Sequence, residues 1–89
     1  MAWDIGLSDN FDVWFTGLDD SEQEAIVVAV NRLKEVDDNL DAAPFVGRVR
    51  GSRRRDVREL RVDGSDLTVR FTFDRRRQVI ELHAGGASG

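Results

Sequence analysis

The sequence contains no cysteine and no tyrosine, and only one histidine, His83, and one proline, Pro44. Without cysteine, neither a disulfide nor a cysteine-ligated zinc site can form. A single histidine leaves too few ligands for other zinc sites, and the acidic residues do not have the spacing of a calcium loop. The Gly85-Gly86 pair begins no predicted helix, unlike a phosphate-binding loop. We therefore expect no metal and no cofactor.

Long apolar runs are also absent, since no stretch approaches the ~20 residues that a membrane span needs. The first residues lack the basic start and apolar block of a secretory signal. We expect a cytoplasmic protein with no membrane association. A chain of 89 residues is long enough for one small core. Residues 1–84 are expected to form this domain, and residues 85–89 a flexible C-terminal tail.

Charge is distributed unevenly along the chain. Residues 1–47 contain eleven acidic and two basic residues, a net charge of −9, whereas residues 48–89 contain eleven basic and six acidic residues, a net charge of +5. Such a change of sign creates local potentials that the overall charge of −4 hides. The second half either forms an anion site or only neutralises an acidic helical layer.

The first half of the chain predicts a strand and two helices. Alternation in residues 3–7 predicts a short strand with Trp3, Ile5 and Leu7 on its buried face. Ser8 is a suitable N-cap for a helix that ends at Gly17, with an aromatic stripe packed into the core. Asp19 begins a second helix, and this helix is expected to end near residue 39.

The second half predicts four strands, at residues 45–50, 57–62, 67–73 and 78–84. They are joined by a basic loop at residues 51–56, a hairpin at residues 63–65 and a turn at residues 74–76. The order predicts an α+β fold. It has an N-terminal strand, a helical hairpin and then a mainly antiparallel sheet with helices on one face.

Alternation along these strands separates two faces of the sheet. The apolar face contains Leu60, Val62, Leu67, Val69, Phe71, Phe73, Ile80, Leu82 and Ala84, and we expect the helices to cover it. The opposite face, here called the open face, contains Glu59, Arg61, Thr68, Arg70, Thr72, Glu81 and His83. Arg58 has the parity of the apolar face, but it begins a strand, so its guanidinium is expected to reach solvent.

The open face combines the groups that cleavage of a phosphodiester requires. Guanidinium groups, here Arg61 and Arg70 with the basic loop, can neutralise the developing charge, and His83 or Glu81 can move a proton. The alternative is structural, since the two arginines can instead form cross-strand ion pairs with Glu59 and Glu81.

Several short sequence motifs, in this order, resemble those of the RelE/ParE toxin superfamily, and within it those of the HigB-like, phage-derived Gp49-type branch. They are Phe11-Asp12-Val13-Trp14-Phe15, Leu18 through Ile26, Val49-Arg50-Gly51-Ser52-Arg53, Arg58-Glu59-Leu60-Arg61-Val62, Val69-Arg70-Phe71-Thr72-Phe73-Asp74 and Val79 through Gly86. The resemblance covers nearly the whole chain.

This resemblance implies the toxin of a type II toxin–antitoxin pair. Such a toxin is a metal-independent endoribonuclease, an mRNA interferase that inhibits translation by cleaving messenger RNA on the ribosome. A cognate antitoxin, expected to be of the helix-turn-helix type, would bind it and cover its basic sheet. Arg61 and Arg70 match arginines of the family's site. The residues expected to bind RNA are Arg50, Arg53, Arg54, Arg55 and Arg58.

The sequence departs from the family at two points. Relatives usually continue beyond the Gly-Gly pair into a final helix with active-site residues, and no tyrosine is present to stack on a base. His83 is therefore the candidate for proton transfer. Two alternatives remain: a ParE-like toxin that inhibits gyrase, and a catalytically weakened module that only binds antitoxin or RNA.

Overall fold

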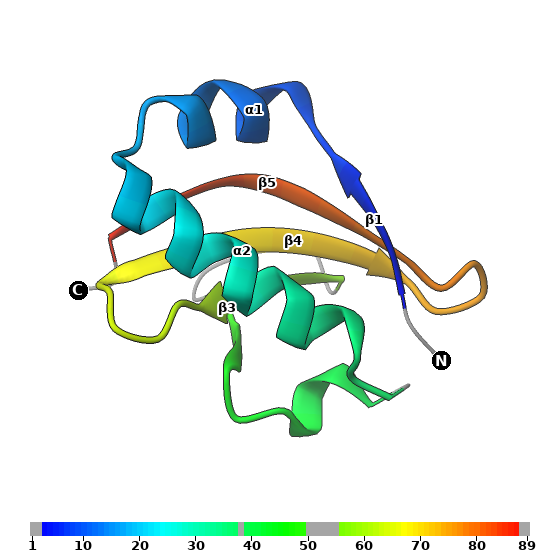
Figure 1. Cartoon of the computed structure of the whole chain (residues 1–89). Helices are drawn as coiled ribbons and strands as arrows, with labels where there is room; N and C mark the ends of the chain where they lie inside the picture. Colours follow the sequence, from blue (N-terminus) through cyan, green and yellow to red (C-terminus); the bar gives the residue numbers. More distant parts are fainter. Residues whose placement is uncertain (1–2, 38, 50–55, 88–89) are drawn as a thin grey trace.

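The computed structural model describes residues 3–37, 39–49 and 56–87. Within these residues two α-helices, a short 3₁₀ helix and five strands follow one another (Figure 1). Their bounds are β1 Asp4–Leu7, α1 Asp9–Thr16, α2 Asp20–Lys34, η1 Leu40–Ala42, β2 Val46–Arg48, β3 Val57–Arg61, β4 Leu67–Asp74 and β5 Val79–Ala87.

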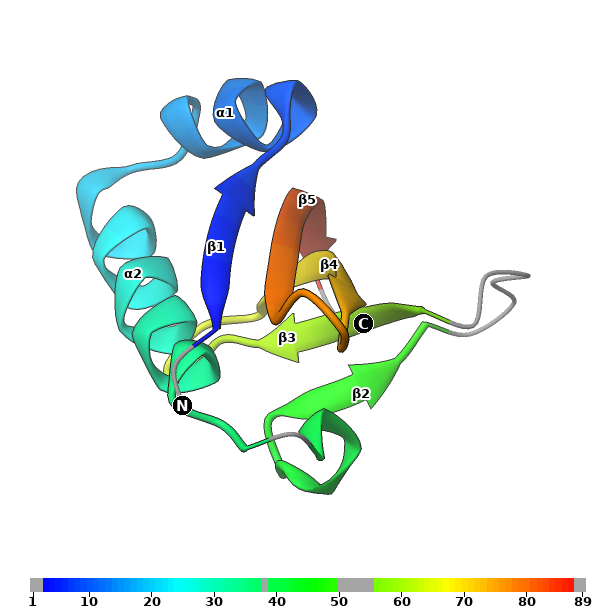
Figure 2. The ribbon, with the colours of Figure 1, turned by 90° about the vertical axis from the view of Figure 1, so that its right-hand side faces the viewer.

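The strands form one sheet in the order β1-β5-β4-β3-β2. β1 pairs with β5 in parallel, and the other three pairings are antiparallel. The strands turn progressively from β1 to β2 (Figure 2), which is the usual twist of a sheet. The predicted α+β fold is thus confirmed, and the structure adds the parallel pairing of the first strand with the last.

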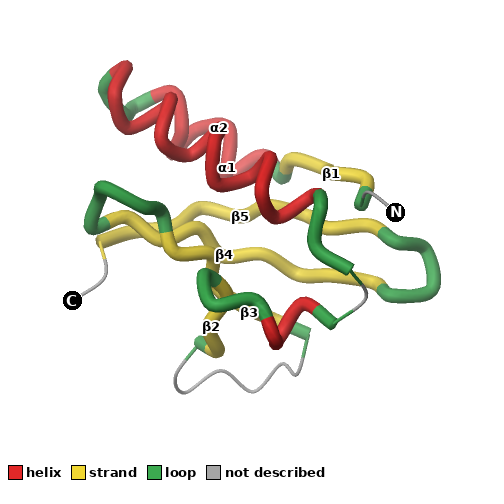
Figure 3. Tube along the Cα trace, turned by 60° about the horizontal axis from the view of Figure 1, so that its bottom comes forward, coloured by secondary structure: helices red, strands yellow, loops and turns green. Residues whose placement is uncertain are grey.

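Both helices lie on the same side of the sheet, as Figure 3 shows. The core between the two layers consists of apolar residues from both: Trp3, Phe11, Ile26, Ala29, Leu33, Leu40, Val46, Leu60, Val62, Val69, Phe71, Ile80 and Leu82. The strand alternation therefore predicted the buried apolar positions of β3, β4 and β5 correctly. The open-face residues lie on the other side of the sheet, away from the helices.

The starts of both α-helices agree with the capping signals in the sequence. The Ser8 side chain accepts a hydrogen bond from the backbone of Phe11 at the start of α1. At the start of α2, Asp19 and Glu22 form the expected capping box, with each side chain accepting from the other's backbone N–H. The backbone N–H of Glu22, and after it the hydroxyl of Ser21, donate to the Asp19 carboxylate and lower its pKa below the ordinary value of 3.8.

Several expectations for individual segments were wrong. Leu7, placed on the buried face of the first strand, is 55% exposed. The second helix ends at Lys34 rather than near residue 39, and its end is held by Trp3, whose backbone and ring N–H groups donate to Lys34 and Val36 carbonyls. Thr68 lies opposite Arg61 on the open face, as predicted, but it is buried there.

The last strand is longer than its sequence pattern predicted. β5 continues past Ala84 to Ala87, which is paired with Leu67 of β4. Residues 85–87, expected to begin the flexible tail, therefore belong to the sheet. Residues 88 and 89 lie outside the described residues.

This extension contains a β-bulge that changes the side-chain alternation. Thr68 is opposite Gly86 and Arg70 is opposite His83, so two residues of β5 face the single residue Val69 of β4. One of the two is Gly85, where a Cβ would lie 1.8 Å from the Thr68 carbonyl oxygen. Only glycine allows the strands to approach so closely.

Candidate functional site

The open face is organised as a row of residues that crosses four strands. Gly47 of β2 is opposite Glu59 of β3, which is opposite Arg70 of β4, which is opposite His83 of β5. The side chains of directly opposite residues on one face lie next to each other. Three residues that lie far apart in the sequence, Glu59, Arg70 and His83, are thus neighbours, as the strand pattern predicted.

A second row lies beside the first and supports His83. Thr72 is opposite Glu81, and both side chains reach the histidine ring. The Thr72 Oγ1 atom lies 3.1 Å from His83 Nε2, and Glu81 Oε1 lies 3.5 Å from the same nitrogen. The His83 side chain is 26% exposed, so the ring is held in place by its neighbours while part of it remains accessible to a ligand.

Arg70 is exposed at the centre of this site. Among the residues that the structure describes, its guanidinium forms no hydrogen bond and no ion pair. Glu59, Arg61, Arg70 and Glu81 form no ion pair with one another, so the cross-strand pairs of the structural alternative are not made. The five N–H donors of the Arg70 guanidinium are therefore available to an anion. The planar arrangement of these donors is suited to two parallel hydrogen bonds with a phosphate.

Arg61 points away from this centre. Its Nη1 atom donates to the Pro44 carbonyl oxygen at 3.0 Å. A Cβ at Gly47 would lie only 2.9 Å from Arg61 Nη2, so the guanidinium lies over β2. Arg61 shares the open face with Arg70, as predicted, but its guanidinium group does not lie beside His83.

Arg58 was predicted to reach solvent, and this prediction was wrong. The residue is 6% exposed, and its Nε atom donates to Asp41 Oδ1 at 2.6 Å. Its guanidinium also lies 5.4 Å from the centre of the Phe73 ring. A phosphate could reach this guanidinium only by displacing Asp41, so the structure gives Arg58 a role in the fold and argues against its expected role in RNA binding.

Sequence reasoning missed Asp41 as a partner because the residue lies in η1, a short element with no periodic signal. The hydrogen bond from Arg58 lowers the pKa of the Asp41 carboxyl below its ordinary value of 3.8, although burial opposes this, and Arg48 and Arg75 add to the lowering. Sequence reasoning also missed the contact of Thr72 with His83, although the alternation placed both on the open face.

The remaining predicted RNA-binding residues, Arg50, Arg53, Arg54 and Arg55, lie outside the described residues. In the described ranges, no group of three or more histidine, cysteine, aspartate or glutamate side chains is arranged to hold a metal ion. No helix in this part of the chain is long and apolar enough to cross a membrane.

Comparison with solved structures supports the fold. A chain of the archaeal RelE–RelB complex from Pyrococcus horikoshii superimposes with a TM-score of 0.76 at 14% identity, over 100% of this chain and 98% of that one. The isolated E. coli RelE toxin superimposes with a TM-score of 0.73 at 10% identity, over 99% of this chain and 86% of that one. These likenesses establish a RelE fold.

Sequence comparison establishes the family. A Mycobacterium tuberculosis protein, designated HigB2 and described as a candidate toxin, is 36% identical over 92 aligned residues, which include all of this chain. The chain spans less than half, 45%, of the length of HigB2. The model of the phage-derived Gp49-like family matches residues 13–86, which include both rows of the open face. The chain belongs to the phage-derived Gp49-like family.

Proposed function

We propose that this protein is the toxin of a type II toxin–antitoxin system and acts as a ribosome-dependent mRNA endoribonuclease. The observation that carries the proposal is the row Glu59–Arg70–His83 on a RelE fold. It places an arginine without an ion pair among the described residues directly beside a histidine that is oriented by two neighbours. Dependence on the ribosome and control by a cognate antitoxin are what the resemblance to RelE/ParE toxins implies.

The reaction is transesterification of the RNA backbone. The 2′ oxygen of the nucleotide attacks the adjacent phosphorus, and His83 accepts the 2′-hydroxyl proton. Arg70 neutralises the charge that develops on the non-bridging oxygens, and Arg61 adds a positive charge at the side of the site. The bond from phosphorus to the 5′ oxygen breaks, and this oxygen takes a proton from water. The products are a 2′,3′-cyclic phosphate and a 5′-hydroxyl end.

Glu81 and Thr72 assist by holding the imidazole. Because both oxygens approach His83 Nε2, a proton on this nitrogen is stabilised, which leaves Nδ1 as the basic nitrogen of the neutral ring. The carboxylate of Glu81 also stabilises the ring when it becomes charged during the reaction.

The test is controlled expression in a bacterial host, with growth curves and mapping of new RNA 5′ ends. The parent protein should arrest growth and cleave messages. Arg70→Ala and His83→Ala should each reduce cleavage by about 10²-fold or more, which is the usual loss for a charge-stabilising or proton-transferring group. Arg76→Ala is the matched control, because Arg76 is an exposed arginine in the turn between β4 and β5, away from the open face.

Two outcomes would contradict the proposal. Growth arrest with intact messages and an induced DNA-damage response would instead indicate a gyrase inhibitor. No arrest, together with tight binding to the antitoxin, would indicate a module that has lost catalysis. A smaller effect of Arg61→Ala than of Arg70→Ala is expected, because the Arg61 head is held at Pro44.

A further inference from the structure

The middle of α2 is apolar on every side. Residues 25–30 read Ala-Ile-Val-Val-Ala-Val, and six consecutive residues at about 100° each pass completely around a helix. Ile26 and Ala29 are buried against the sheet, whereas Val27 and Val28 are 50% and 60% exposed. Two adjacent β-branched residues on a solvent-facing helix surface lower helix propensity and expose apolar area.

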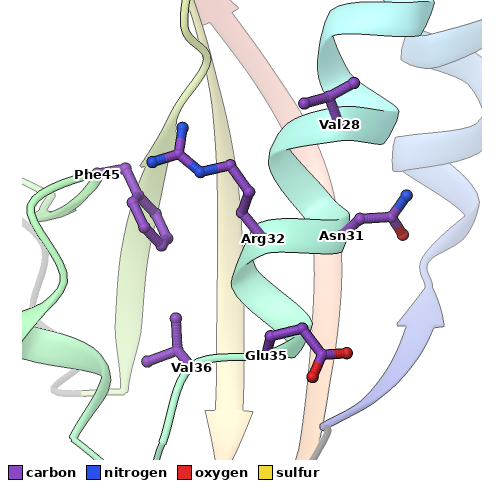
Figure 4. Close-up of a pocket in the computed structure, with 6 residues that line it drawn as sticks. All are labelled: Val28, Asn31, Arg32, Glu35, Val36 and Phe45. Atoms are coloured by element: carbon purple, nitrogen blue, oxygen red, sulfur yellow. The ribbon is translucent and has the colours of Figure 1, made fainter.

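Three hollows adjoin these two valines. A hollow of about 570 Å³ lies between Val28 and Phe45 (Figure 4), and a second, of about 590 Å³, lies between Val28 and Phe15. A third, of about 350 Å³, extends from Val27 and Phe15 to Leu7. Because neighbouring hollows share Val28, or Val27 and Phe15, they form one surface, which we call the α2 groove.

The charges around the α2 groove are mainly negative. The acidic side chains that line it are Asp12, Asp20, Glu24 and Glu35. Arg32 is the basic residue among the lining residues of these hollows, and it is already engaged, with Asp63 at 2.6 Å and with the Phe45 ring at 4.7 Å. Figure 4 shows its guanidinium directed to this ring. An occupant with positive charges would therefore be complementary.

We propose that the α2 groove is the docking surface for a basic amphipathic helix of a protein partner. Aliphatic side chains of this helix would enter the hollows beside Val27 and Val28, and lysine or arginine side chains would face the acidic rim. A helix is favoured over a strand because the backbone of α2 is internally bonded, so that an added strand would find no partners for its N–H and C=O groups. α2 has 15 residues and is about 22 Å long, which suits an occupant of about four turns.

The position of the groove has a consequence for the proposed function. α2 covers the apolar face of the sheet, and Arg70 and His83 lie on the opposite face. A helix in the groove would leave the open face uncovered. The partner could be the antitoxin, an identification that rests on the proposed function. In that case a second, acidic segment of the antitoxin would have to cover the basic open face and inhibit the toxin.

The experiment uses the full chain and a synthetic 18-residue peptide that has a leucine stripe at helical spacing and lysines elsewhere. Binding is measured by fluorescence anisotropy and located by ¹⁵N-HSQC perturbation. A scrambled peptide of the same composition, without the stripe, is the peptide control. We expect perturbations along α2 and at Phe45, and weaker binding of the scrambled peptide.

Two variants test the apolar and the electrostatic parts. Val28→Asp should weaken binding by about tenfold or more, the usual loss for a central apolar anchor. Val13→Asp is its matched control, because Val13 is 76% exposed on α1 and lines none of these hollows. Glu24→Lys should also weaken binding of the basic peptide, and the effect should shrink at high salt.

The following outcomes would overturn the inference. They are perturbations confined to the Arg70–His83 face, equal binding of the scrambled peptide, or no binding up to about 1 mM peptide. Concentration-dependent dimerisation that Val28→Asp abolishes would identify a second copy of the chain as the occupant instead. RNA cleavage should be unchanged in Val28→Asp, so that failure of the docking proposal is distinguishable from failure of the proposed function.

Discussion

At the scale of residues, neighbouring arginines of the basic half have different environments. Arg58 is buried against Asp41 and the Phe73 ring, Arg61 is held at Pro44, and Arg70 is exposed beside His83. The Arg58–Asp41 pair fastens η1 to the sheet, since the two residues lie on different elements 17 positions apart. A buried guanidinium that loses its carboxylate partner is costly, because its charge is then uncompensated.

Asp41→Asn should therefore destabilise the fold. We expect a loss of about 1–3 kcal/mol in the free energy of unfolding, because a hydrogen bond to a charged group is replaced by a weaker neutral one. Urea denaturation measures it. Asp37→Asn is the matched control, an exposed aspartate that follows α2, and it should change stability by less than about 0.5 kcal/mol. Equal stability of the two variants would show that the Arg58–Asp41 pair contributes nothing.

The same pair predicts a dependence on pH. The pKa of Asp41 is lower in the folded protein than its ordinary value of 3.8, mainly because Arg58 donates to the carboxylate. The stabilisation is thus fully present above 3.8 and is lost as the pH falls below this value towards the folded pKa. The acid limb of a stability-against-pH curve should accordingly be flatter in Asp41→Asn than in the parent.

The open face could be predicted from the sequence because alternation is a local property. Side chains alternate between the two faces of β3, β4 and β5 at Glu59, Arg70 and His83. This alternation was enough to predict that the three residues lie on one face of the sheet. The direction of a long side chain, in contrast, depends on partners that lie far away in the sequence. Arg58 and Arg61 are directed by Asp41 and Pro44, partners 17 residues away that have no periodic signal.

At the scale of elements, the bulge in β5 determines how the last strand ends. Beyond Leu82 the partner strand β1 has ended, and the Asn10 side chain of α1 accepts from the Ala84 N–H at 2.8 Å. The bulge then allows Gly86 and Ala87 to continue the ladder with β4. This register change could not be predicted from the sequence, because a Gly-Gly pair is equally typical of a strand end.

Gly85→Ala and Gly86→Ala should differ strongly. A Cβ at Gly85 would lie 1.8 Å from the Thr68 carbonyl oxygen, whereas a Cβ at Gly86 would meet no atom within 4 Å. We expect Gly85→Ala to lower the free energy of unfolding by about 1–3 kcal/mol or more, because backbone must move. Gly86→Ala should be nearly neutral. Thermal melts of the two variants under the same conditions provide the comparison, and similar melting temperatures would contradict the described bulge.

At the scale of the whole molecule, the uneven distribution of charge along the sequence becomes a difference in charge between the helix side and the open face of the sheet. The acidic rim of the α2 groove lies on the helix side, and Arg61, Arg70 and His83 lie on the open face. The overall charge of −4 therefore does not describe the potential that RNA meets.

Binding of a short single-stranded RNA should fall steeply with salt, because each phosphate contact releases counterions. Arg70→Gln should reduce the slope of log K against log salt by about 0.7, the contribution of one contact to a single strand. Arg32→Gln, on the helix side, should leave the slope unchanged. Anisotropy titrations at several salt concentrations measure both, and an unchanged slope in Arg70→Gln would remove Arg70 from the phosphate contacts.

The parallel pairing of β1 with β5 has a consequence for synthesis of the protein. β5 lies between β1 and β4 in the sheet, yet it is the last of the five strands to leave the ribosome. Until residues 79–87 have been made, β1 has no neighbour and the apolar faces of β4 and of the helices remain incompletely covered. Such long-range pairings form late. The Arg70–His83 pair should therefore form only near the end of translation of this domain.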